Sequence, residues 1–330
     1  MTAASPEQGD FTSPRTWTGS LDGTSREARE LACLWLTEPE IGGPAAAAEY
    51  HRLLLDGVPP FAGAYLDRDG FVSWSDEPRV WWPAGWRPPD WVRAAATDHL
   101  GVSLLVLAEL GGSAGPAARH LASWAPLATA ALRSYAPQPP FDELSDRTDR
   151  VVMAALSASA AEPDQEVAGS AADGAEVAGS HTDGPEALSG GTALGSASEE
   201  WPEPPDSDPD DELGLNAVVS WLAVPRRAGW CLTVPDVGRI AGALELPASR
   251  TGGRRDALAT LFHGAGRDGA TWDLLRALDD EAARAQAHYG RLATEWPSWT
   301  PIGRAWAAQT AVTRGFLARL GAAAEGAQAP

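Results

Sequence analysis

Asp98-His99 and the nearby Ser103 form a polar group on an otherwise apolar stretch and are the first candidates for chemistry. A carboxylate can orient a neighbouring imidazole for proton transfer, and residues four apart share one face of a helix. His99 and Ser103 would therefore form a polar notch on the helix that we expect here. Catalysis needs a nucleophile with a base and an orienting group in reach, and no such third partner accompanies them. The alternative is a buried, hydrogen-bonded histidine whose tautomer is held by Asp98.

The residue types argue against metal and cofactor chemistry. His99 and His120 could approach one another, but no cluster with ligand spacing surrounds them, so we expect no metal site. The cysteines, Cys33 and Cys231, lie far apart and lack CxxC spacing, which indicates neither a zinc site nor a disulfide framework. All 25 basic residues are arginine, which excludes a Schiff-base or P-loop lysine. The residues by themselves therefore carry no catalytic signature.

Three segments carry the most specific pattern in the chain. Residues 59–67 read PPFAGAYLD, with a proline pair and Phe61 ahead of an aromatic-Leu-Asp triplet. Asp98-His99 opens the apolar stretch that runs to Leu110, and residues 120–128 read HLASWAPLA. In order and spacing these segments resemble the TorD/DmsD/NarJ family of cytoplasmic chaperones, which are dedicated to molybdenum-cofactor oxidoreductases.

The resemblance covers roughly residues 24–158 and implies a binding function. Proteins of this family are not enzymes, so the resemblance implies a protein that is not an enzyme and needs no cofactor. They bind the twin-arginine leader or the apo form of a molybdopterin oxidoreductase catalytic subunit and hold it for cofactor insertion before export or assembly. Two alternatives are a non-catalytic adaptor or assembly module for another redox complex, and a hydrolase, which the missing catalytic constellation disfavours. The residues that the resemblance assigns to the client site are Phe61, Tyr65, Leu66, Asp67, Asp98, His99 and Trp124, although Phe61 and Tyr65 could instead anchor the loop in the core.

Tryptophans gather in the loop that follows the first motif. Residues 74–91 contain five indoles in a proline-rich stretch, and an exposed aromatic surface of this kind usually marks a partner site. Guanidinium groups of a twin-arginine leader can stack on indoles and form forked bonds to carboxylates. We therefore add Trp74 and Trp91 to the client site, with Asp67, Asp69, Asp76, Glu77 and Asp98 as nearby carboxylates. The alternative is that several of these indoles pack against the C-terminal helices.

Internal arginine pairs invite a different interpretation. Arg226-Arg227 and Arg254-Arg255 look like twin arginines, but no apolar run follows them, so they are not export signals. We interpret them as solvated cations at helix ends.

The net charge of −20 argues against nucleic-acid binding, but the acidity is concentrated in one segment. Residues 157–212 carry 15 of the 45 acidic residues, no arginine, a degenerate ten-residue repeat beginning at Glu166 and Glu176, and one aromatic residue, Trp201. Such a composition cannot bury enough surface to offset chain entropy, so we expect a disordered acidic linker. A regulatory role as an acidic decoy is the alternative.

Apolar periodicity predicts an all-α protein. The resemblance implies that its N-terminal part is a helical bundle of the TorD-like type, which the linker and a C-terminal helical region would follow. The expected divisions are a flexible tail at 1–23, the chaperone domain at 24–156, the linker at 157–212, the C-terminal region at 213–324 and a tail at 325–330. No signal peptide or membrane-spanning stretch is apparent, so we expect a cytoplasmic protein without stable membrane insertion, monomeric or dimeric. The expected helices span about residues 25–37, 45–55, 90–110, 116–134, 141–158, 213–224, 235–246, 253–263, 271–296 and 300–321, with a capping box at Thr233.

Overall fold

The computed structural model describes residues 23–38, 43–55, 57–66, 86–92, 97–111, 115–161, 201–205, 214–249 and 253–328. The regular elements of these residues are helices. One isolated antiparallel β-bridge, between Phe61 and His99, is also present among them. The all-α prediction is therefore confirmed for the part of the chain that the structure describes.

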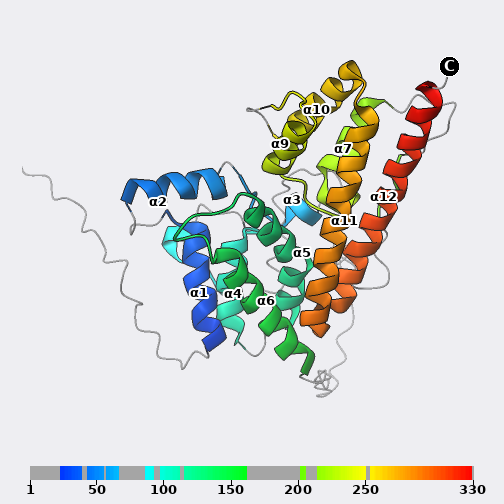
Figure 1. Ribbon diagram of the computed structural model, residues 1–330. Coiled ribbons are helices and arrows are strands. Elements are labelled where there is room, and N and C mark those ends of the chain that lie inside the picture. Colours follow the sequence, from blue (N-terminus) through cyan, green and yellow to red (C-terminus); the bar gives the residue numbers. More distant parts are fainter. Residues whose placement is uncertain are drawn as a thin grey trace, which may run out of the picture.

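The first group of helices forms a bundle around α4. This helix is apolar on all sides, and all of its residues from Leu100 to Ala108 are buried. It packs against α1 and α5, while α6 packs against both of those helices (Figure 1). The elements are α1 (Gly23–Leu36), α2 (Gly43–Tyr50), the π-helical turn η1 (His51–Leu55), α3 (Gly63–Leu66), the 3-10 turn η3 (Asp90–Val92), α4 (Leu100–Leu110), α5 (Gly115–Ser134) and α6 (Leu144–Ala161).

The second group is dominated by two long helices, α11 and α12, which pack along each other beside the first bundle (Figure 1). The shorter helices α7, α9 and α10 pack together near one end of this pair. The predicted capping box at Thr233 is confirmed: its hydroxyl accepts the N–H of Asp236, whose carboxylate accepts the N–H of Thr233. The elements are α7 (Leu215–Ala223), α8 (Pro225–Ala228), α9 (Val234–Ala243), α10 (Arg254–Asp268), α11 (Thr271–Glu295), the 3-10 turn η5 (Pro297–Trp299) and α12 (Thr300–Gln328).

Among the described residues the buried apolar side chains form two cores, and the first continues across both groups of helices. The second core lies within α7 to α10 and the facing parts of α11 and α12. The first core contains the residues of the N-terminal bundle, but it also takes in Tyr289, Leu292, Trp299, Ile302 and Trp306. The C-terminal helical region is thus packed into the bundle rather than set apart from it.

A proline inside α5 explains why these two groups join. Pro126 has no N–H, so the carbonyl of Ala122, four residues earlier, lacks its helical donor. The indole N–H of Trp299 donates to that carbonyl at 2.7 Å, and the indole of Trp306 donates to the carbonyl of Ser123 at 2.8 Å. Both indoles are fully buried, where an unsatisfied carbonyl would be costly. The C-terminal helices therefore complete the hydrogen bonding of α5.

The helix expected over about residues 90–110 is shorter than predicted. Asp90–Val92 forms the separate turn η3, and α4 begins only at Leu100. His99 precedes it as the N-cap, in an extended backbone conformation with φ −69° and ψ 136°. The predicted end is correct, because Gly111 follows the helix with a positive φ of 50°.

The expected acidic linker over residues 157–212 is described at its two ends. Residues 157–161 belong to α6, and Trp201 packs against Trp306 of α12, so neither end fits the expected disordered linker. The other linker residues, 162–200 and 206–212, lie outside the described part of the chain. Residues 1–22 of the expected N-terminal tail also lie outside it, while the expected C-terminal tail is helical as far as Gln328.

The Trp299–Ala122 hydrogen bond predicts that the effect of a Trp299 substitution on stability depends on whether residue 126 is proline. Trp299→Phe should lower the free energy of unfolding by about 1–3 kcal/mol, because the buried carbonyl loses its donor. Pro126→Ala restores an intrahelical N–H for that carbonyl, so the same Trp299→Phe change should cost less in that background. Urea denaturation of the two single variants and the double variant measures the coupling. Strict additivity would contradict the compensation.

Candidate functional site

Two backbone hydrogen bonds bring the first two sequence motifs together. The N–H of Leu100 donates to the carbonyl of Pro60 at 2.7 Å, and the N–H of Ala62 donates to the carbonyl of Asp98 at 3.0 Å. They form the antiparallel bridge between Phe61 and His99. The loop before α3 is thereby fixed against the N-terminus of α4.

Asp98 holds this loop in place and does not orient His99. Its Oδ2 accepts the N–H of Gly63 at 3.2 Å, and its Oδ1 has no hydrogen-bond partner among the described residues. The residue is 1% exposed, and burial raises the pKa of its carboxyl, opposed by the Gly63 hydrogen bond. Asp98 was expected to offer a carboxylate to a client guanidinium; its buried position instead makes it a support of the loop.

His99 is a helix cap, which corrects the expected polar notch. Its Nδ1 accepts the N–H of Gly101 at 3.0 Å, so the ring precedes α4 and does not share a helix face with Ser103. Burial lowers the pKa of His99 from 6.5 to about 4, so the imidazole is neutral near pH 7. Because Nδ1 accepts, the proton lies on Nε2, and that nitrogen is a donor.

Gly101 allows α4 to approach α1 closely at this point. A Cβ at Gly101 would lie 2.4 Å from Cγ of Leu36 and 3.1 Å from the carbonyl of Ala32. Any larger residue would push the first turn of α4 away from α1. Two features therefore position the His99 ring: its hydrogen bond to the N–H of Gly101, and the close contact of Gly101 with α1.

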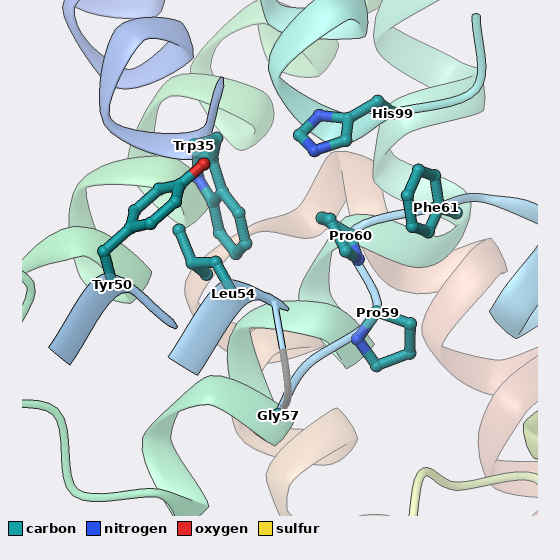
Figure 2. Close-up of a pocket in the computed structure, with 8 residues that line it drawn as sticks. All are labelled: Trp35, Tyr50, Leu54, Gly57, Pro59, Pro60, Phe61 and His99. Atoms are coloured by element: carbon teal, nitrogen blue, oxygen red, sulfur yellow. The ribbon is translucent and has the colours of Figure 1, made fainter. Parts of the chain in front are cut away.

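A pocket of about 330 Å³ opens beside His99. Its lining comes from α1, α2, η1, the proline loop and the α4 cap, and Figure 2 shows the His99 ring pointing across it toward Trp35 and Tyr50. Phe61 meets the His99 ring edge to face, with the ring centroids 5.3 Å apart. The lining residues are Trp35, Tyr50, Leu54, Gly57, Pro59, Pro60, Phe61 and His99.

The wall opposite His99 is apolar with a polar edge. Burial raises the pKa of the Tyr50 hydroxyl, and the negative charge of Glu38 raises it further, so the phenol stays neutral. Glu38 itself is exposed and lies 3.6 Å from His51. At Gly57 a Cβ would lie 2.6 Å from the carbonyl of Arg52, so the backbone passes too close there for a side chain.

Tyr65 and Trp124 lie in the core and do not line the pocket. Their rings are stacked, with centroids 5.8 Å apart and an interplanar angle of 21°, and both residues are fully buried. Both rings have the positions that the anchoring alternative expects, and they support α3 against α5. The pair therefore fixes the far end of the loop that carries Phe61.

The remaining expected site residues are divided between the core and the part of the chain that the structure does not describe. Leu66 is half-buried and packs against the first core, as does Trp86. Asp67 and Trp74 lie outside the described residues, and Trp91 falls in η3, where its side chain is not described. Of the residues expected at the client site, the structure brings Phe61 and His99 together at the pocket.

Sequence reasoning missed the pocket walls supplied by α1, α2 and η1. Trp35, Tyr50 and Leu54 read as ordinary core positions of amphipathic helices, and only packing places them opposite His99. The structure itself adds a local mark of this region, because η1 is a π-helical turn and such turns are frequent at functional sites. Pro59 and Pro60 belonged to the motif but were not assigned to the client site.

One arginine of the internal pairs is not solvated, contrary to expectation. Arg226 is 2% exposed and its guanidinium lies 4.7 Å from the ring centroid of Trp201. The guanidinium of Arg254 donates to the sulfur of Cys231 at 3.0 Å.

The described residues contain no group of His, Cys, Asp and Glu side chains suited to hold a metal ion. No helix among them combines the length and the apolar character needed to cross a membrane.

Comparisons of the sequence with protein-family models, with curated proteins and with solved structures found no match.

The lowered pKa values of His99 and His120 predict acid sensitivity of the fold. Burial lowers the pKa of His99 and of His120 to about 4, whereas the unfolded chain binds these protons near 6.5. The unfolded state therefore gains protons first, and the free energy of unfolding should fall from about pH 6.5 to about pH 4, by up to ~1.4 kcal/mol per pH unit for each histidine.

Urea denaturation at about pH 7 and about pH 5 measures this dependence. His99→Asn keeps an N-cap acceptor but removes one titrating group, so its loss of stability between the two pH values should be smaller than that of the wild type. Equal losses in the two proteins would show that His99 does not contribute.

Proposed function

We propose that this protein is a non-catalytic cytoplasmic chaperone of the TorD type. It binds the twin-arginine leader, or the apo form, of a molybdopterin oxidoreductase subunit and holds it for cofactor insertion before export or assembly. The observation that carries the proposal is the pairing of Phe61 with His99, because it joins two of the three motifs on which the resemblance rests at the edge of one pocket.

The chemistry of the pocket suits the apolar stretch of a leader peptide. Trp35, Leu54 and Phe61 offer apolar walls, and burial of an aliphatic side chain there removes its surface from water. The neutral His99 ring offers an Nε2–H that can donate to a peptide carbonyl, since Nδ1 is already used by Gly101. A peptide side chain with its adjacent carbonyl fits this combination.

The arginines of a leader need acceptors near the pocket. Glu38 is exposed and acts electrostatically on Tyr50, which lines the pocket. A guanidinium can form a forked pair with such a carboxylate. We therefore assign Glu38 to the ionic part of leader binding, in place of the buried Asp98.

The central test separates the role of His99 in binding from its role as a helix cap. His99→Asn retains a side-chain acceptor for the N–H of Gly101 but removes the ring from the pocket, so affinity for a synthetic twin-arginine leader peptide should fall about tenfold. The melting temperature should change little. Isothermal titration and thermal unfolding on the same samples measure both quantities.

The matched control is His263→Asn, which changes an exposed histidine of α10, and it should leave affinity at the wild-type value. Lowered stability of His99→Asn with unchanged affinity would remove the pocket from the proposed function. Capture from native lysate then tests the class of client: an exported molybdoenzyme supports the chaperone, whereas another redox subunit would favour the adaptor alternative.

The ionic part of binding should be small and salt-dependent. Glu38→Gln should weaken leader affinity about two- to fivefold at ~0.05 M salt and have little effect at ~0.5 M, because exposed ion pairs are worth under ~1 kcal/mol and are screened. Glu245→Gln, an equal charge change beside the second core, is the control. Binding to the wild type that vanishes at high salt would contradict a mainly apolar pocket.

A further inference from the structure

A short proline-rich segment of the chain is seated on the C-terminal helices, away from the pocket. Residues 201–205 read WPEPP and belong to no helix. Glu203 is exposed, while the other residues of the segment are half-buried. Three prolines in five positions favour the extended polyproline II conformation, which needs no internal hydrogen bonds.

The surface beneath this segment recognises each of its parts separately. Trp306 meets the ring of Trp201 edge to face, with centroids 5.0 Å apart, and Arg226 covers the Trp201 ring at 4.7 Å. Gln309 donates its side-chain amide to the carbonyl of Pro202 at 3.0 Å. The same amide donates to the carbonyl of Arg227 at 2.6 Å, which fixes its direction.

This combination is the chemistry by which proteins bind proline-rich peptides. Aromatic and cationic side chains contact the rings of the peptide, and a fixed donor forms a hydrogen bond with one of its backbone carbonyls. The peptide backbone is already extended, so it loses little conformational entropy on binding. With the segment in place, Trp306 and Gln309 are 0% and 3% exposed. The segment is held by a ring contact, a cation–π contact, a hydrogen bond and the packing of half-buried Trp201 against the first core.

We propose that Arg226, Trp306 and Gln309 form a recognition surface for a proline-rich segment of a partner protein that carries a tryptophan before its first proline. Trp201–Pro205 occupies this surface as an internal ligand and competes with the partner. An internal ligand competes at an effective concentration in the millimolar range, so a partner segment binds only when it displaces or outcompetes residues 201–205.

The test uses the full chain and the peptide acetyl-Trp-Pro-Glu-Pro-Pro-amide. Trp201→Ala weakens the internal ligand, so this variant should bind the peptide at least about tenfold more tightly than the wild type. Glu203→Ala changes the exposed residue of the same segment and should match the wild type. Trp201→Leu, which keeps apolar packing on Trp306, repeats the measurement if Trp201→Ala does not fold.

Gln309→Met tests the location of the site. Added to Trp201→Ala, it removes the donor with little change of volume, and peptide affinity should fall at least about tenfold. Binding that is no tighter in the Trp201 variants than in the wild type would overturn the proposal, as would binding that survives Gln309→Met.

Sedimentation of the wild type tests whether the segment instead joins two copies of this chain. A dimer that Trp201→Ala abolishes would show that the segment pairs two copies of this chain, which overturns the proposal of a separate partner. A monomer supports it. Leader binding at the pocket is not needed for any of these measurements, so they stand or fall independently of the proposed chaperone function.

Discussion

The hydrogen bonds that two indoles donate to α5 are the constraint on which the rest of the structure depends. Pro126 leaves a carbonyl of α5 without its helical donor, and a buried carbonyl without a hydrogen bond is costly unless another group donates to it. Trp299 donates to it, and Trp306 binds the next carbonyl. The C-terminal helices are thereby tied to the bundle at one defined position along α5.

Both candidate binding surfaces extend from this position. On one side, Trp124 follows directly in α5 and stacks on Tyr65, which anchors the loop carrying Phe61. On the other side, Trp306 is the platform on which Trp201 rests. The same short stretch of α5 therefore supports the pocket through one tryptophan and receives the proline-rich segment through another.

His99 shows how one side chain can serve structure and recognition together. Its Nδ1 caps α4, which leaves the other nitrogen as a donor and orients the ring across the pocket. Burial keeps the imidazole neutral near pH 7, so it offers a hydrogen bond rather than a charge. A ring used in this way suits an uncharged peptide group, and this is why the ionic part of leader binding is assigned to exposed Glu38 instead.

Local signals in the sequence predicted the longer helices but not the short helices α3 and α8. Apolar periodicity located most of them within a few residues, and the capping box at Thr233 and the glycine at 111 marked two boundaries correctly, because caps act within one turn of the chain. The motif also drew attention to Phe61 and His99 before their contact was known. The start of α4 was misplaced because the helical pattern does not reveal that residue 99 bends into extended backbone to pair with the proline loop.

What the sequence determined by itself is the all-α character of the described chain, its helical segments and the residues that would have to meet if the motifs form one site. Only the tertiary structure decided that His99 faces Trp35 and Tyr50, that Tyr65 and Trp124 lie in the core, and that Trp201 is docked on Trp306. The reason is physical. Helix formation depends on neighbours within a turn, whereas these contacts join residues tens of positions apart, and their partners are set by how the helices pack and by which buried polar groups still need a donor.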